Sequence, residues 1–182
     1  MYKQIFLKRG KEESLKRFHP WIFSGAIHHM DEGIEEGETV RVITAAGEFI
    51  GVGHYQIGSI AVRVLSFEDI EINTDFWCER LQSALDVRIG VGIADSPTNN
   101  TYRLVHGEGD YLPGLVIDCY GSTAVMQAHS VGMHVCRNEI CQALVQVMGD
   151  RIANVYYKSE TTLPYKADLH QENGFLVGGD AS

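Results

Sequence analysis

Glycines interrupt the β-rich runs near the start of the chain, and this feature limits the possible folds more than any other. Alternating apolar residues predict short strands at positions 38–44, 48–55 and 60–67. Gly51 and Gly53 fall inside the second run, where glycine usually marks a bulge or a tight barrel corner. We therefore expect a small, strongly bent β-barrel over about residues 1–70.

The rest of the chain has a different rhythm. Asn73 and Thr74 offer helix N-caps, and apolar residues at helical spacing predict an amphipathic helix over 75–89. The later segments predict one further helix over 131–148. They also predict strands at 102–106, 115–120, 123–129, 154–158 and 172–177. These elements indicate a small α+β layer of sheet and helix, so the expected fold class is mixed α+β.

Composition excludes several classes of protein. The chain has 182 residues, a formal net charge of −9 and 45% hydrophobic residues, which is typical of a soluble globular protein. No apolar run approaches the roughly 20 residues of a membrane span, and the N-terminus is too charged for a signal peptide. The four cysteines therefore read as reduced thiols, and we expect a cytoplasmic protein.

Charge is distributed unevenly along the chain. Residues 1–20 carry a net charge of +4, whereas residues 21–182 carry −13. The predicted phosphate-binding cations of this basic segment are Lys8, Arg9, Lys11, Lys16 and Arg17. His19 and Trp21 follow directly and offer planar rings to unpaired bases. Two alternatives stay open: the lysines form only a solvated terminus, and Trp21 packs in the barrel core, where we expect Ile22 and Phe23.

Other motifs give little support to catalysis or to cofactor binding. Neither Gly51-Val-Gly53 nor the glycine-rich segment 107–114 lies between a strand and a helix N-terminus, as a dinucleotide loop requires. Ser24 and Ser130 lack a nucleophile elbow, and Cys136 and Cys141 lie about 140° apart around a helix. The residues predict no catalytic, cofactor-binding or metal site.

One acidic segment allows a competing interpretation. His106, Glu108 and Asp110 alternate along the chain and imitate a metal site or an acid–base pair. We expect these three residues to make hydrogen bonds within a tight loop instead. A small hydrolase that uses them is the weaker alternative.

Two longer stretches resemble a known family. They are residues 17–27, with the sequence RFHPWIFSGAI, and residues 98–118, with the sequence TNNTYRLVHGEGDYLPGLVID. Both are similar to signatures of the bacterial large-subunit rRNA cytosine-5 methyltransferase family, whose N-terminal module is a PUA domain. The similarity covers essentially the whole chain, although Cys119 stands where a basic residue is expected.

The resemblance implies a domain order. A PUA-like RNA-binding barrel occupies 1–72, a connecting helix and loop 73–100, and a strand-strand-helix-strand-strand domain 101–172. Residues 173–182 then form the first strand of a missing Rossmann-like domain, which in the family binds S-adenosylmethionine and carries the catalytic cysteine. The chain is thus expected to be truncated and inactive alone, with no catalytic, cofactor or metal residues to carry over.

The resemblance also implies partners. We expect the chain to be the substrate-recognition portion of an S-adenosylmethionine-dependent enzyme and to bind large-subunit ribosomal RNA, with Arg103 adding a charge from the second domain. The alternative is a free-standing PUA-containing RNA-binding adaptor without methyltransferase activity. No membrane partner is expected, and a homodimer is an open alternative.

Overall fold

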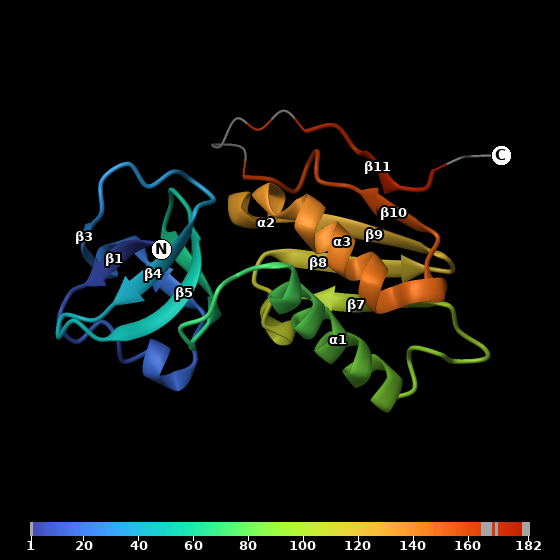
Figure 1. The fold of residues 1–182 in the computed structure, drawn as a ribbon, viewed down its shortest axis with the longest axis horizontal. Helices are drawn as coiled ribbons and strands as arrows, with labels where there is room; N and C mark the ends of the chain where they lie inside the picture. The colour runs from blue at the N-terminus through green and yellow to red at the C-terminus, as the bar shows by residue number, and fades with distance from the viewer. Residues whose placement is uncertain (1, 165–168, 170, 180–182) are drawn as a thin grey trace. The chain divides into compact units, whose positions relative to one another are not determined.

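The computed structural model describes residues 2–164, 169 and 171–179. The chain divides into two compact units, Met1–Glu71 and Ile72–Ser182. Each unit has its own sheet, as Figure 1 shows. We describe the two units separately.

The first unit is a six-stranded sheet in the order β2-β6-β5-β4-β1-β3. Its strands are β1 (Lys3–Leu7), β2 (Trp21–Phe23), β3 (Ile27–Met30), β4 (Thr39–Ile43), β5 (Phe49–Tyr55) and β6 (Ile60–Ser66). All neighbouring pairs are antiparallel except β1 and β4. The predicted runs at 38–44, 48–55 and 60–67 therefore form strands, while β2 and β3 lie outside the strands predicted from the sequence.

The chain itself joins the two edges of this sheet. Edge strands β2 and β3 are separated only by the 3₁₀ turn η2 (Ser24–Ala26). Three residues span about 10 Å at most, so the sheet has to curl until its edges approach each other. The backbone N–H of Lys8, just after β1, donates to Ala26 O at 2.8 Å. This hydrogen bond stabilises the curled arrangement. The expected bent, barrel-like sheet is thus confirmed.

Small residues and branched side chains fill the interior of the curled sheet. Ile5, Val40, Val42 and Val62 are completely buried in its core. At Gly53 a β-carbon would lie 2.1 Å from the carbonyl oxygen of Arg63, so only glycine allows β5 and β6 to approach this closely. The register shifts at this point, which confirms the bulge expected from a glycine inside a strand.

The second unit is a five-stranded sheet with helices, in the order β11-β10-β9-β8-β7. Its elements are α1 (Thr74–Gly90), β7 (Thr101–His106), the 3₁₀ turn η3 (Gly107–Asp110), β8 (Leu115–Tyr120), β9 (Thr123–Ala128), α2 (Val131–Val135), α3 (Arg137–Met148), the 3₁₀ turn η4 (Gly149–Arg151), β10 (Asn154–Tyr157) and β11 (Gly174–Val177). The mixed α+β class is confirmed. Three strands precede α2 and α3, one more than in the strand-strand-helix-strand-strand order.

The helix expected over 131–148 is two helices that meet at Cys136. This residue has a ψ of 3° and is both the C-cap of α2 and the N-cap of α3. The apolar spacing continues across the break because Met133 and Ile140 both remain buried. Side-chain periodicity alone therefore does not reveal the interruption.

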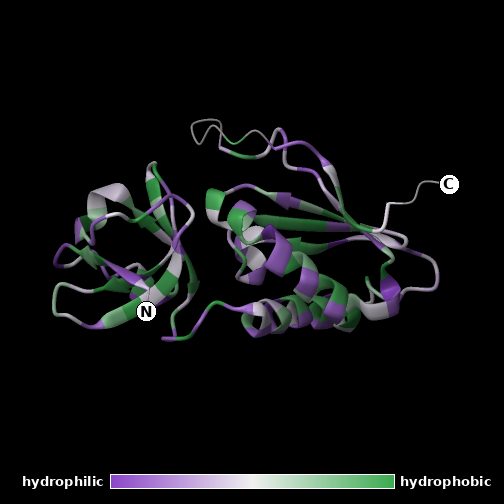
Figure 2. Cartoon of the chain, turned by 45° about the horizontal axis from the view of Figure 1, so that its top comes forward, coloured by the Kyte–Doolittle hydropathy of each residue, from purple (hydrophilic) through white to green (hydrophobic). Residues whose placement is uncertain are grey.

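The helices pack on one face of the second sheet. α1 and α3 lie side by side (Figure 1), and His134 of α2 is joined to the Tyr157 hydroxyl of β10 by a hydrogen bond of 2.8 Å. Buried strand residues such as Ile117 and Met126 share this face. Figure 2 shows the central strands coloured largely as hydrophobic. Residues on the other side of the strands, such as Val125 and Tyr156, stay half-buried.

None of the helices formed by the described residues combines the length and the apolar character needed to cross a membrane.

Candidate nucleic-acid interface

The predicted basic segment forms the connection between β1 and β2. It contains the one-turn η1 (Leu15–Arg17), whose Leu15 is 2% exposed and anchors the segment to the core of the first unit. Phe18 then adopts a left-handed conformation with φ 61°, and its backbone N–H donates to Leu15 O at 2.8 Å. This tight reversal holds the cations on an exposed connection and directs the chain into His19 and Trp21.

Two of the five predicted cations already have partners. Lys8 Nζ donates to the backbone carbonyl of Gly25 at 2.9 Å. Lys16 Nζ forms an ion pair with Glu13 at 2.8 Å, and the hydrogen bond between these groups lowers the pKa of Glu13 and raises that of Lys16. The charge of Lys16 is therefore partly compensated, whereas that of Lys8 is not.

The other three cations are available to a ligand. The side chains of Arg9, Lys11 and Arg17 are exposed, and within the described part of the chain no hydrogen bond or ion pair engages them. An exposed cation without a carboxylate partner does not have to break an existing ion pair when it binds a phosphate. The structure thus separates the five predicted residues into a free group and a partnered group.

Aromatic rings continue the surface from the cations. The His19 and Trp21 rings meet edge to face with centroids 5.7 Å apart, and Trp21 meets Phe23 in the same way at 6.5 Å. His19 Nδ1 accepts a hydrogen bond from the Trp21 backbone N–H at 3.2 Å, which fixes the imidazole beside the indole. His19 is exposed and Trp21 is half-buried.

The prediction that Phe23 lies in the core is wrong. Its side chain is 51% exposed, whereas Ile22 is 2% exposed and does lie in the core. Alternation along β2 explains the difference, because side chains two residues apart lie on the same face of a strand. Phe23 therefore lies on the same face as Trp21, and Ile22 lies on the opposite face. Recognising 21–23 as a strand would have revealed Phe23 as part of the surface.

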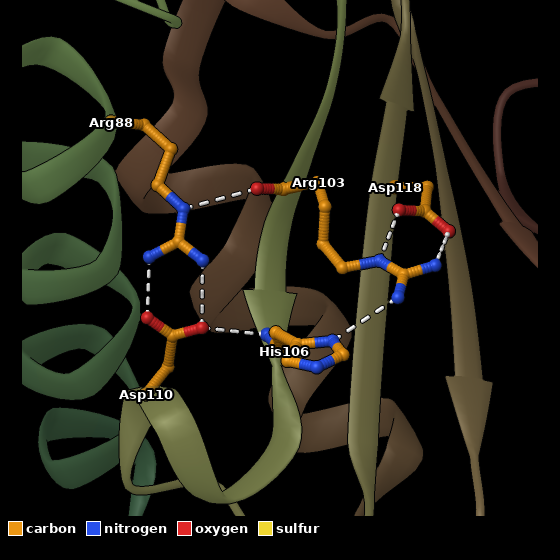
Figure 3. Close-up of polar contacts among 5 residues, drawn as sticks. All are labelled: Arg88, Arg103, His106, Asp110 and Asp118. Atoms are coloured by element: carbon orange, nitrogen blue, oxygen red, sulfur yellow. Dashed lines mark hydrogen bonds and ion pairs between the residues drawn. The ribbon is translucent and has the colours of Figure 1, made fainter. Parts of the chain in front are cut away.

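Arg103 belongs to the second unit, whereas the other predicted residues belong to the first. Its Nε and one terminal nitrogen bind both carboxylate oxygens of Asp118, at 2.7 and 3.0 Å (Figure 3). This bidentate hydrogen bonding raises the pKa of Arg103. The remaining terminal nitrogen contacts His106 Nδ1 at 3.1 Å. The guanidinium is half-exposed but occupied, so its role in RNA binding stays a prediction.

The His106-Glu108-Asp110 segment is held together by structural contacts. Asp110 forms a bidentate ion pair with Arg88 of α1, and its Oδ2 accepts the His106 backbone N–H at 2.6 Å (Figure 3). Arg88 Nε also donates to Arg103 O at 3.0 Å. Both Asp110 oxygens are thereby engaged, and the side chain is only 7% exposed. These contacts tie η3 to α1 and β7 and do not favour the hydrolase alternative.

The glycine segments do not form a loop between a strand and a helix that would hold S-adenosylmethionine. Gly53 is required by the close approach of β5 and β6, and its space is filled by the Arg63 backbone. The segment 107–114 leads into β8 and not into a helix N-terminus. These two segments thus offer no cradle for this cofactor, and we assign no chemical step through it to this chain.

Comparison with known proteins identifies relatives of this chain. Residues 5–67 match the family model of the PUA-like domain. Ribosomal RNA large subunit methyltransferase I of Vibrio parahaemolyticus is 38% identical over 179 residues, which cover 98% of this chain and 44% of that protein. The same enzyme of Aliivibrio fischeri is 36% identical over 180 residues, with equal coverage.

The chain is homologous to the N-terminal part of these methyltransferases. It spans less than half the length of the curated relatives that it matches. The PUA-like identity of the first unit and the resemblance carried by residues 17–27 and 98–118 are confirmed.

Solved structures show the same fold. A protein from Streptococcus mutans described as a SAM-dependent methyltransferase superposes with a TM-score of 0.79 at 21% identity, over 98% of this chain and 44% of that chain. A methyltransferase structure in complex with SAH gives a TM-score of 0.78, also at 21% identity, and this chain covers 43% of it. The fold is therefore shared with proteins of distant sequence.

Proposed function

We propose that this chain is the RNA-recognition portion of an S-adenosylmethionine-dependent rRNA (cytosine-5) methyltransferase. The observation that carries the proposal is a set of exposed cations followed by aromatic rings, on the connection before β2 and on β2 itself, in the PUA-like unit. Unpartnered Arg9, Lys11 and Arg17 precede the ring series His19, Trp21 and Phe23 along the chain. Cations that neutralise phosphates beside rings that stack on bases are the combination that single-stranded RNA requires.

The same surface explains why an acidic chain would bind a polyanion. The formal net charge is −9, but the positive charge is concentrated in the first 20 residues. A local cationic patch attracts RNA even when the whole protein is acidic, because salt screens charges beyond about 10 Å. A few phosphate contacts give weak nonspecific binding, roughly 10⁻⁴–10⁻⁶ M at physiological salt.

The methyl-transfer chemistry belongs, in this proposal, to the part of the relatives that the chain does not cover. There S-adenosylmethionine would supply the methyl group, and a cysteine thiolate would activate C5 of cytosine. This chain's own residues bind and orient RNA. Large-subunit rRNA as the partner, the cytoplasm as the location and a homodimer as the assembly are further proposals, supported for the RNA by the names of the relatives.

The test is a binding titration of this chain with an unpaired segment of large-subunit rRNA, followed by fluorescence anisotropy. The comparison protein has Lys8, Arg9, Lys11, Lys16 and Arg17 replaced by alanine. We expect binding that weakens steeply with salt and is lost in the variant. Equal binding by both proteins, or none by either, would contradict the assignment of the recognition surface.

The adaptor alternative is separated by a different assay. A longer protein that contains this chain is incubated with rRNA and S-adenosylmethionine, and methylated cytosine is measured. Methylation that depends on the basic segment supports the proposal. RNA binding without methylation would favour the adaptor.

A further inference from the structure

A cavity opens beside the cations of the first unit. It has a volume of about 300 Å³ and lies between η1, β2 and η2. Leu15 and Ile22, each 2% exposed, line it as apolar core residues. Trp21, Phe23 and the exposed Lys11 also line it. This volume is at the lower end of the range for small-molecule sites.

The two rings have a geometry suited to a planar ligand. Their planes are inclined by 86° and their centroids lie 6.5 Å apart, so the rings form a corner. A flat ring that stacks on one of them meets the other edge to face, and both arrangements are favourable for aromatic pairs. An aliphatic ligand would gain nothing from this orientation.

The polar groups at the cavity specify the rest of the ligand. Lys11 has no hydrogen-bond or ion-pair partner for its ammonium among the described residues, so it is free to bind an anion. Ser14, which carries a hydroxyl, also lines the cavity. A ligand that matches the whole site combines a planar ring with a nearby negative charge. Within RNA, that combination is a nucleotide whose base has left the stack.

Gly25 contributes bare backbone to the cavity lining, although its own conformation does not require glycine. A β-carbon there would meet no heavy atom within 4 Å, and Gly25 is not among the glycines with positive φ. Neither packing nor backbone conformation therefore demands glycine at this position. The absence of a side chain keeps the space beside Trp21 and Phe23 open.

We infer that this cavity holds one unstacked base of the bound RNA, with the base against Trp21 and Phe23 and its phosphate beside Lys11. The inference rests on the proposed function and extends it, because it assigns one of the contacted bases to a defined pocket in the RNA-binding surface. Phosphate contacts alone would not discriminate between paired and unpaired RNA, whereas the pocket admits only a base that is free of its partner.

The test compares two oligonucleotides with equal numbers of phosphates. One is an unstructured single-stranded RNA, and the other has the same length but lacks every base. We expect the chain to bind the complete RNA at least about five-fold more tightly, which is the lower end of the contribution of one stacked base. Phe23→Ala is expected to reduce this preference clearly without changing the salt dependence. Tyr120→Ala, which removes a 53% exposed ring from the second unit, is the matched control and should keep the preference.

A second variant fills the cavity without removing any of its rings. Gly25→Leu places a side chain in open space, so the fold should be retained, and the preference for the complete RNA should fall to near one. Gly90→Ala is its control, because a β-carbon at Gly90 also meets nothing within 4 Å. Circular dichroism of both variants verifies the fold.

Binding of a base in the cavity can be measured directly by the fluorescence of Trp21. The chain contains two tryptophans, and Trp77 is completely buried in the second unit. In a Trp77→Phe background, the complete RNA should quench the fluorescence of Trp21, whereas the oligonucleotide without bases should not.

The outcomes separate this inference from the proposed function. Equal affinity for both oligonucleotides, or an undiminished preference in Phe23→Ala, would overturn the base pocket while salt-dependent binding still supported the RNA surface. Absence of binding to either oligonucleotide would overturn both.

Discussion

Glu13 neutralises Lys16 across 2.8 Å, within the same exposed connection that carries the three unpartnered cations. Both side chains are more than half exposed, so this pair holds little of the fold together. Its main effect is therefore on the electrostatic potential of the surface that we assign to RNA. A ligand phosphate must compete with the Glu13 carboxylate for Lys16.

Removing this carboxylate should strengthen RNA binding. Glu13→Gln leaves the side-chain shape nearly unchanged and frees the Lys16 ammonium. We expect a roughly two- to five-fold gain in affinity at low salt, and a steeper salt dependence because one more cation contacts phosphate. Anisotropy titrations at several salt concentrations measure both quantities. Glu32→Gln removes an equal charge elsewhere in the unit and should give a smaller gain. Weaker binding by Glu13→Gln would show that the pair positions Lys16.

His54 makes the first unit sensitive to acid. Burial and, to a smaller extent, the positive charge of neighbouring Arg63 together lower the pKa of His54 to about 4, whereas in the unfolded chain the imidazole titrates near 6.5. The unfolded state therefore binds the extra proton first. Stability should fall as the pH decreases from about 6.5 toward 4, by roughly 3 kcal/mol in total for this group.

Urea unfolding of the Trp77→Phe protein at pH 7.5, 6.0 and 5.0, followed through Trp21, measures this loss in the first unit. His54→Gln has no titrating group at this position and should show a shallower pH dependence. Identical pH dependence in both proteins would mean that His54 does not control the acid response.

The Arg88–Asp110 pair should stabilise the second unit. Its side chains are 13% and 7% exposed, and Asp110 also accepts the His106 backbone N–H. Asp110→Asn leaves Arg88 largely buried without a countercharge, so we expect a loss on the order of 3 kcal/mol in the free energy of unfolding. Trp77 fluorescence reports this transition.

The control is Asp95→Asn. Asp95 pairs with Arg151 in an equally bidentate way, but both side chains are at least 42% exposed. Replacement of Asp95 should reduce the free energy of unfolding much less than replacement of Asp110. RNA binding should be unchanged in both variants. A comparable loss in the two would show that burial does not determine the strength of these pairs.

The cysteines of this chain should be poor nucleophiles. Burial raises the pKa of Cys119 and of Cys136 to about 11, and burial also raises the pKa of Cys78 and Cys141. At pH 7.5 the first two should hold about a hundred-fold less thiolate than an ordinary cysteine. Reaction with a disulfide reagent should be slow in buffer and fast in urea. Rapid labelling of Cys119 in the folded protein would contradict this prediction.

Much of the fold could be predicted because it follows local patterns. The alternation of Val40 and Val42 in β4 and the helical spacing of Trp77 and Leu81 in α1 both place buried residues correctly. The edge strands β2 and β3 were missed because they are only three and four residues long and are joined by a single turn. Their pairing depends on partners far away in the sequence, which periodicity does not record.

The site was predictable as a type of surface but not as an arrangement. Composition identifies the basic segment, and the rings at 19 and 21 follow it. The pairing of Lys16 with Glu13, the availability of Arg9 and the exposure of Phe23 depend on the path of the chain through η1 and β2. Arg103 shows the same limit, because its partner Asp118 is fifteen residues away on the neighbouring strand.

The most direct test of the RNA-recognition surface is the salt dependence of binding when Arg9, Lys11 and Arg17 are all replaced by alanine. For single-stranded RNA, each lost phosphate contact reduces the slope of log K against log salt by about 0.7, so we predict a slope smaller by about 2. Lys158→Ala, an exposed cation of the second unit, should leave the slope unchanged. A triple variant with the slope and affinity of the original chain would contradict the assignment of RNA recognition to this surface.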